Sequence, residues 1–278
     1  GAFPAEYSNA LSGVLDMNLR TGNNQKRENT VQLGLVGIDV ASEGPFKKGS
    51  NSSYIFNYRY STLGLLSSML PEDAENTKYQ DLSFKLNFPT KSAGVFSLWG
   101  VGLIDRSGQK AETDPSKWEY MQDKEDQDVK QYMGAFGLNH KLRVWNNATL
   151  KTTLATTVSG LDMHTERMDA NVKPIPQNLI KSTNWNFVFA SSLNKKYSRI
   201  HTNKTGIRAT GLKYNLLLKE ATHQQPMNTI TDESGFSSLL SAYTNSSFQF
   251  SDEWTLNLGI NTQLFTLNNN LSLIHISE

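Results

Sequence analysis

The sequence has no cysteine, and this absence excludes disulfide bonds, thiolate metal sites and cysteine nucleophiles. It has almost no net charge, because 27 Lys and Arg residues balance 26 Asp and Glu residues over 278 positions. A nucleic-acid binder needs excess positive charge to displace counterions from phosphates, so this class is disfavoured. Long apolar runs are also missing, which excludes a membrane-spanning helix but leaves open a membrane barrel of alternating strands.

Motifs that carry catalysis or hold a cofactor are absent from the sequence as well. None of the five histidines lies in an HExxH arrangement, and no nucleophile elbow, Walker A loop or dinucleotide-binding glycine motif occurs. The acidic stretch from Glu119 to Asp128 fits no EF-hand spacing, and its interspersed lysines favour a solvated loop over a calcium site. We therefore expect no enzyme activity, no cofactor and no resident metal.

What the sequence does contain is a periodicity of two, the pattern of β-strands whose side chains alternate between two faces. From Gln80 to Phe88, for example, leucine and phenylalanine alternate with polar residues. In a membrane barrel the apolar set faces lipid. The lipid-facing candidates are Tyr54, Phe56, Tyr58, Tyr60, Leu82, Phe84, Leu86, Phe88, Trp254, Leu256 and Leu258.

The connections between the expected strands alternate in length. Short connections at one end and long loops at the other are typical of outer-membrane barrels. Trp145 and Trp254 flank short connections, where an aromatic girdle would lie at the membrane surface. A β-sandwich that buries the same aromatics remains the alternative. The long loops are expected at Arg106–Lys130, Met163–Thr183 and Lys219–Phe236.

The first 20 residues, GAFPAEYSNALSGVLDMNLR, resemble the end of the plug domain in TonB-dependent outer-membrane receptors, the active importers of Gram-negative bacteria. Tyr7, Gly13, Val14 and Arg20 match the plug-end motif, although serine stands at two positions where the family usually has glycine. The stretches YRYSTLGLL, YQDLSFKLNF and GVFSLWGVG resemble the Bacteroidetes-type form of the family. The resemblance extends over most of the chain, but its specific motifs lie before about residue 102.

The resemblance implies an all-β fold: an incomplete antiparallel transmembrane β-barrel, present as a curved open sheet of about 10–11 strands with a short plug remnant at the N-terminus. Residues 1–20 would be the end of the plug, 21–28 a linker and 29–270 roughly the first half of the barrel. Residues 271–278 are expected not to belong to the native protein. The chain is thus expected to be a fragment that lacks the TonB box and most of the plug.

The resemblance also implies a function, which is energised import across the bacterial outer membrane of a scarce, bulky nutrient such as a metal chelate, a vitamin or a glycan. The expected partners are outer-membrane lipid, an imported ligand of unknown identity, and TonB, which would act through the missing N-terminal segment. Trp118 and Tyr120 lie in a predicted outer loop and are candidate ligand contacts. The alternatives are a passive porin-like or adhesive barrel and, less favoured, a secreted glycan-binding β-sandwich.

Overall fold

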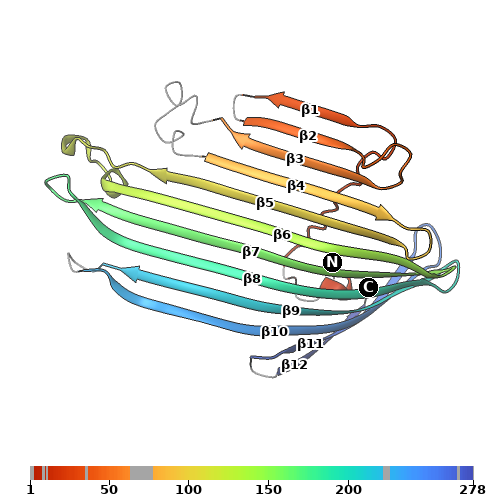
Figure 1. Ribbon diagram of the computed structural model, residues 1–278. Coiled ribbons are helices and arrows are strands. Elements are labelled where there is room, and N and C mark those ends of the chain that lie inside the picture. The colour runs from red at the N-terminus through yellow and green to blue at the C-terminus, as the bar shows by residue number, and fades with distance from the viewer. Residues whose placement is uncertain are drawn as a thin grey trace.

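The computed structural model describes residues 3–7, 10, 12–34, 37–62, 78–221, 226–267 and 270–277. These residues form one antiparallel sheet in which every strand pairs with its neighbours in sequence (Figure 1). The strands are β1 (Glu28–Leu33), β2 (Gly37–Pro45), β3 (Ser53–Ser61), β4 (Lys78–Pro89), β5 (Val95–Gln109), β6 (Glu125–Trp145), β7 (Ala148–Met168), β8 (Pro174–Lys196), β9 (His201–Glu220), β10 (Asn228–Gln249), β11 (Thr255–Phe265) and β12 (Asn270–Ser277).

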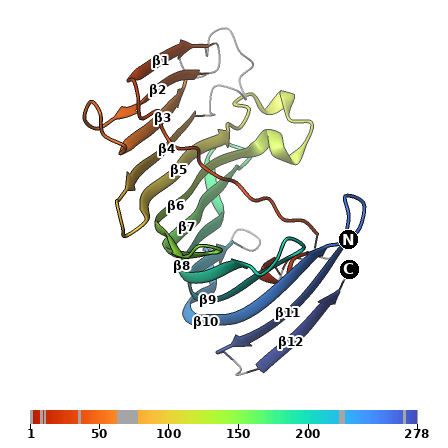
Figure 2. The ribbon, with the colours of Figure 1, turned by 90° about the vertical axis from the view of Figure 1, so that its right-hand side faces the viewer.

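The sheet is curved and open, with β1 and β12 at its two edges (Figure 2). The predicted architecture is therefore confirmed, although the sheet has 12 strands and not 10 or 11. The additional strand is β12, which pairs with β11. It lies in the segment that was expected not to belong to the native protein, and that expectation stays a prediction. The first hairpin is formed by β1 and β2, where the Gly34 amide donates to the Gly37 carbonyl at 2.9 Å. No helix among the described residues is long and apolar enough to cross a membrane.

Strands β5 to β10 extend much further than the sequence suggested. The expected loops Met163–Thr183 and Lys219–Phe236 are mostly strand, so these two predictions were wrong, whereas residues 110–124 do form a loop. The charged side chains in these stretches obscured the alternation, yet they pair across strands: Arg167 Nη2 lies 2.7 Å from Glu125 Oε1. Backbone hydrogen bonds between strands do not require apolar side chains, which explains why the ladder continues.

The two faces of the sheet differ in polarity. Register places the polar side chains of β4 on the same face as Asn261 and Lys204, and this face is the concave one (Figure 2). The opposite, convex face is apolar and uncovered, because Ala5 and Ala148 are the only buried apolar residues in the described part of the chain. Leu154, for example, is 52% exposed on this face. A sandwich would bury these side chains under a second sheet, so the structure does not support that alternative.

The apolar character of the convex face is confined to a band. In β7 its positions run from Leu150 to Val158, close to the ~9–11 residues that a strand needs to cross a bilayer. Beyond Tyr132 and Gly160 the polarity of the two faces reverses. There the convex face carries Lys130, Asp162 and Lys181, and the concave face carries Val129, Met163, Ile180 and Leu218.

Candidate functional site

The candidate site is the contact between the leading segment, residues 3–27, and the concave face of the sheet. Figure 2 shows this segment crossing the hollow side of the sheet between β3 and β11. It touches the strands near its two ends, while residues 12–18 between them are exposed. We call these contacts the first anchor (Ala5 and Glu6) and the second anchor (Leu19 to Asn23).

The first anchor holds the short 3-10 helix η1 (Ala5–Tyr7) against β10 and β11. Asn261, which is 1% exposed, donates from Nδ2 to the Ala5 carbonyl oxygen at 2.8 Å. Glu6 forms an ion pair with Lys204 of β9. A side chain at Gly259 would crowd the Ala5 methyl group, since an added Cβ would lie 2.8 Å from it. Polar side chains of β9 and β11 therefore bind one turn of the leading segment.

The second anchor joins the leading segment to β2, β3 and β4. Arg20 and Glu43 form a two-pronged ion pair, with Nη1–Oε2 and Nη2–Oε1 distances of 2.7 and 2.5 Å. Glu43 also accepts from the backbone N–H of Asn23 at 2.8 Å, and Lys85 Nζ donates to the Leu19 carbonyl oxygen at 2.7 Å. The hydrogen bond to Glu43 raises the pKa of the Arg20 guanidinium, a group that is already charged at any physiological pH.

The four predicted plug-end residues separate in the structure. Arg20 lies in the second anchor, and Tyr7 is the last residue of η1. Burial raises the pKa of the Tyr7 phenol, and the Glu6 and Asp16 carboxylates raise it further. Gly13 has no described heavy atom within 4 Å of an added Cβ, and Val14 is 38% exposed. The middle of the motif is therefore more open than its two ends, and an added Cβ on Gly13 would meet no described atom.

Sequence reasoning missed the strand side of both anchors. Glu43, Lys85, Lys204 and Asn261 are single polar residues on the polar faces of their strands, and nothing near them in sequence distinguishes them. Asn261 meets a backbone group 256 positions away. A lone polar residue at an inward position of a strand is the signal that the sequence offers, and it does not identify its partner.

Replacing Gly22 with valine is expected to detach the second anchor. Gly22 is buried, and a Cβ there would overlap the carbonyl group of Tyr54, which belongs to the backbone and cannot rotate away. We expect a cost of about 1–3 kcal/mol and faster tryptic cleavage after Arg20, Lys26 and Arg27. Asn24→Val introduces the same valine side chain at an exposed position two residues away and should leave cleavage unchanged. Equal cleavage of the two variants would contradict the anchor.

The two predicted ligand-contact residues differ in environment. Trp118 donates from Nε1 to the Glu112 carbonyl oxygen at 2.7 Å, and Lys124 Nζ lies 5.2 Å from the centre of its ring. This tryptophan is half-buried and holds its own loop together, between the 3-10 helices η4 (Pro115–Lys117) and η5 (Met121–Lys124). Tyr120 is 67% exposed. An external ligand would thus meet Tyr120 before Trp118, and both contacts stay predictions.

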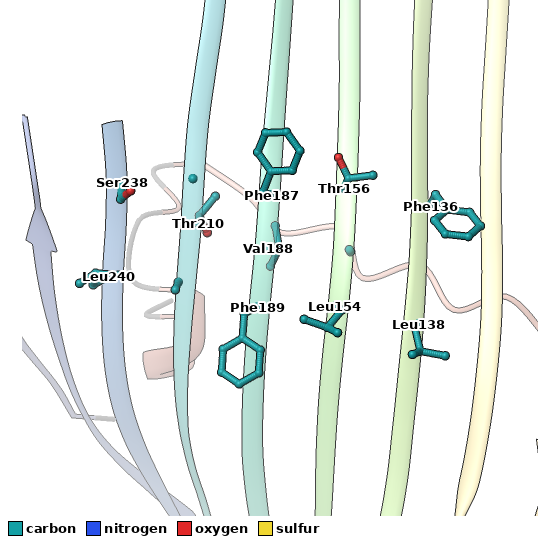
Figure 3. A pocket seen from close by; sticks show the side chains of 13 residues that line it. Phe136, Leu138, Leu154, Thr156, Phe187, Val188, Phe189, Thr210, Ser238 and Leu240 are labelled. Atoms are coloured by element: carbon teal, nitrogen blue, oxygen red, sulfur yellow. The ribbon is translucent and has the colours of Figure 1, made fainter. Parts of the chain in front are cut away.

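The predicted lipid-facing residues of β3, β4 and β11 lie on the convex face, Trp254 directly precedes β11, and none of them is buried. The middle of this face has a shallow hollow of about 460 Å³, open to the outside (Figure 3). Its apolar lining includes Phe136, Leu138, Leu154, Phe187, Phe189 and Leu240. Within the described ranges, no three or more histidine and acidic side chains are arranged to hold a metal ion.

Comparison with known proteins gives matches among solved structures only. No family profile matches the sequence, and no curated protein matches it. The pyoverdine outer membrane receptor FpvA from Pseudomonas aeruginosa PAO1, solved with pyoverdine bound, superposes on 93% of this chain with a TM-score of 0.65 and 12% identity. The siderophore receptor PiuA from Acinetobacter baumannii superposes on 91% with a TM-score of 0.54 and 12% identity.

This chain spans less than half of either receptor, 43% of FpvA and 44% of PiuA. At this level of identity the likeness shows the fold. The chain therefore has the fold of part of an outer-membrane receptor barrel, an incomplete antiparallel barrel with a short segment on its inner face.

Proposed function

We propose that this chain is part of a TonB-dependent receptor that imports a scarce, bulky nutrient across the bacterial outer membrane. One observation carries the proposal: the leading segment is clasped to the polar concave face of a sheet whose apolar convex face is uncovered. The apolar side of such a sheet can face lipid, and its polar side can face an aqueous interior. The segment lies on the interior side, as the end of a plug would.

The anchors suit a plug that is held firmly but can be released. Both consist of ion pairs and hydrogen bonds rather than an apolar core, and the Arg20 side chain is 63% exposed. Water can replace such contacts, and exposed ion pairs contribute only about 0.2–1 kcal/mol each. A pull from TonB on the preceding part of the protein would therefore rearrange the leading segment without unfolding the barrel.

Among the nutrient classes, a metal chelate has the most support. Among the similar structures, FpvA is a pyoverdine receptor with pyoverdine bound, and PiuA is a siderophore receptor. We carry this over as a proposal and take Tyr120, exposed in the 110–124 loop, as the first ligand contact to test. A vitamin and a glycan are the competing classes.

A passive porin-like or adhesive barrel is the second candidate. It would need the same strands but would have no use for a segment anchored at two places across its interior. The contacts of Ala5, Glu6, Leu19 and Arg20 with four different strands therefore favour the plugged importer.

The test is an uptake assay in cells that carry or lack the gene for the full-length protein. Labelled ferric siderophores, a cobalamin and oligosaccharides are supplied separately, with and without a protonophore that collapses the energy source of TonB. We expect uptake of one ligand class, chelates first, to disappear both on deletion and with the protonophore. Uptake that continues with the protonophore would indicate a passive pore and overturn the proposal.

A further inference from the structure

The convex face has a second hollow, at the end of its apolar band where the polarity of the two faces reverses. It measures about 670 Å³, and its floor includes Gly102, whose strand partner is Gly134. Leu82 and Val158 flank these two glycines in the same cross-strand row. Because the glycines have no side chains, the row leaves an apolar groove between two bulky neighbours.

The groove continues down the convex face towards the middle of the band. A further hollow of about 280 Å³ shares Leu82, Gly102 and Val158 with it and extends to Phe84 and Phe136. The Phe84 ring fills the next glycine position, since a Cβ on Gly100 would lie 2.5 Å from it. Gly102 and Gly134, in contrast, are unfilled, because the nearest atoms to their added Cβ positions are 3.8 and 3.4 Å away.

A row of three basic residues borders the groove on the side that faces away from the middle of the apolar band. Lys78 pairs with Arg106 across β4 and β5, and Arg106 pairs with Lys130 across β5 and β6, so the three share the convex face. Lys130 also lines the groove. None of the three has an ion-pair partner among the described residues, whereas the next residue in the row, Asp162, lies 3.8 Å from Lys181. Three neighbouring cations therefore stand at the border of an apolar surface.

We propose that this groove and basic row bind a phosphorylated glycolipid of the membrane's outer leaflet, with an acyl chain in the groove and headgroup phosphates on Lys78, Arg106 and Lys130. The proposal rests on the proposed function, which places the long-loop end outside the cell. In Gram-negative bacteria the leaflet at that end is built from lipid A, whose headgroup carries phosphates.

Geometry and charge both favour this occupant. Lys130 and Gly134 are four residues apart on one strand, roughly 13 Å at the usual rise, which matches a headgroup above its own chain. Adjacent basic residues at a membrane surface attract anionic headgroups, and phosphate accepts charge-assisted hydrogen bonds from Lys and Arg. Tyr132, on the row between them, places an aromatic ring at headgroup level. A soluble anion would explain the cations but not the groove beneath them.

The test uses the full-length protein in nanodiscs and measures retained lipid by native mass spectrometry, with diphosphoryl lipid A and phosphatidylglycerol as probes. The triple variant K78Q/R106Q/K130Q should weaken lipid A binding by about tenfold or more. Gly102→Leu should weaken it by about fivefold with no change in charge, because it fills the groove. The control K47Q/K48Q/K91Q removes the same charge from exposed connections at the opposite end and should change binding less than about twofold.

Equal loss in the control and the row variant, or no loss in either, would overturn the site. Phosphatidylglycerol held as tightly as lipid A, and lost in the same variants, would overturn the glycolipid assignment. The lipid measurement needs no imported ligand, so its failure leaves the import proposal standing. A protein that binds lipid A but imports nothing would overturn only the import proposal.

Discussion

Replacing Leu154 with arginine should destabilise the full-length protein in a bilayer by roughly 2–4 kcal/mol, the cost of a cation on a lipid-facing strand at mid-depth. Leu154 is 52% exposed in the middle of the convex face, where it lines the hollow shown in Figure 3. In a water-soluble protein an exposed leucine could be replaced with a change within about 0.5 kcal/mol. The sign and size of this effect therefore report the solvent that touches the convex face.

The measurement is equilibrium unfolding by urea or guanidinium in phospholipid vesicles. Ser159→Arg is the matched control, because Ser159 lies on the same strand, is exposed and faces the concave side. We expect the control to stay within about 0.5 kcal/mol of the wild type. If both variants behaved like the wild type, lipid would not cover the convex face.

Tethering the leading segment to the barrel should abolish import while leaving ligand binding intact. Cysteines at Ala5 and Gly259 would be close enough to form a disulfide after a shift of roughly 1 Å, given the usual Cβ separation of about 3.5–4.5 Å in such bonds. The chain has no cysteine of its own to compete. Under oxidising conditions we expect uptake to fall by about tenfold or more, because the clasped turn can no longer leave β11.

Addition of a reductant should restore uptake, which separates the tether from damage to the fold. The control pair is A5C/I260C, since Ile260 neighbours Gly259 but points to the convex face and is 45% exposed. This pair should not cross-link. Full uptake by a cross-linked A5C/G259C protein would show that the first anchor stays closed during transport and would contradict release of the leading segment there.

The strand pattern could be read from sequence wherever a strand crosses the apolar band. From Leu82 to Phe88 every second residue is apolar, and the structure places these residues together on the convex face. The alternation is local, since it depends only on which solvent each face meets. Outside the band the alternation no longer identifies the strands. Around Asp162 and Lys181 both strands continue, although side-chain polarity does not predict this continuation.

The candidate site was only half predictable. Tyr7 and Arg20 belong to a recognisable segment, but their partners are set by how far the sheet curves and by the register of strands far apart in sequence. Lys85 reaches Leu19 across 66 positions, and Lys204 reaches Glu6 across 198. The basic row is similar, because Lys78, Arg106 and Lys130 become neighbours only through pairing.

The sequence by itself determined the all-β class, the two chemically different faces and the segment that precedes the barrel. The class and the two faces follow from residue alternation and composition, which act over a few neighbouring positions, and the leading segment follows from its resemblance to the end of a plug domain. Only the tertiary structure decided how far the strands extend, which side the leading segment occupies and which distant residues meet there. Those outcomes depend on the register of antiparallel pairs and on the curvature of the sheet, which every strand in it sets together.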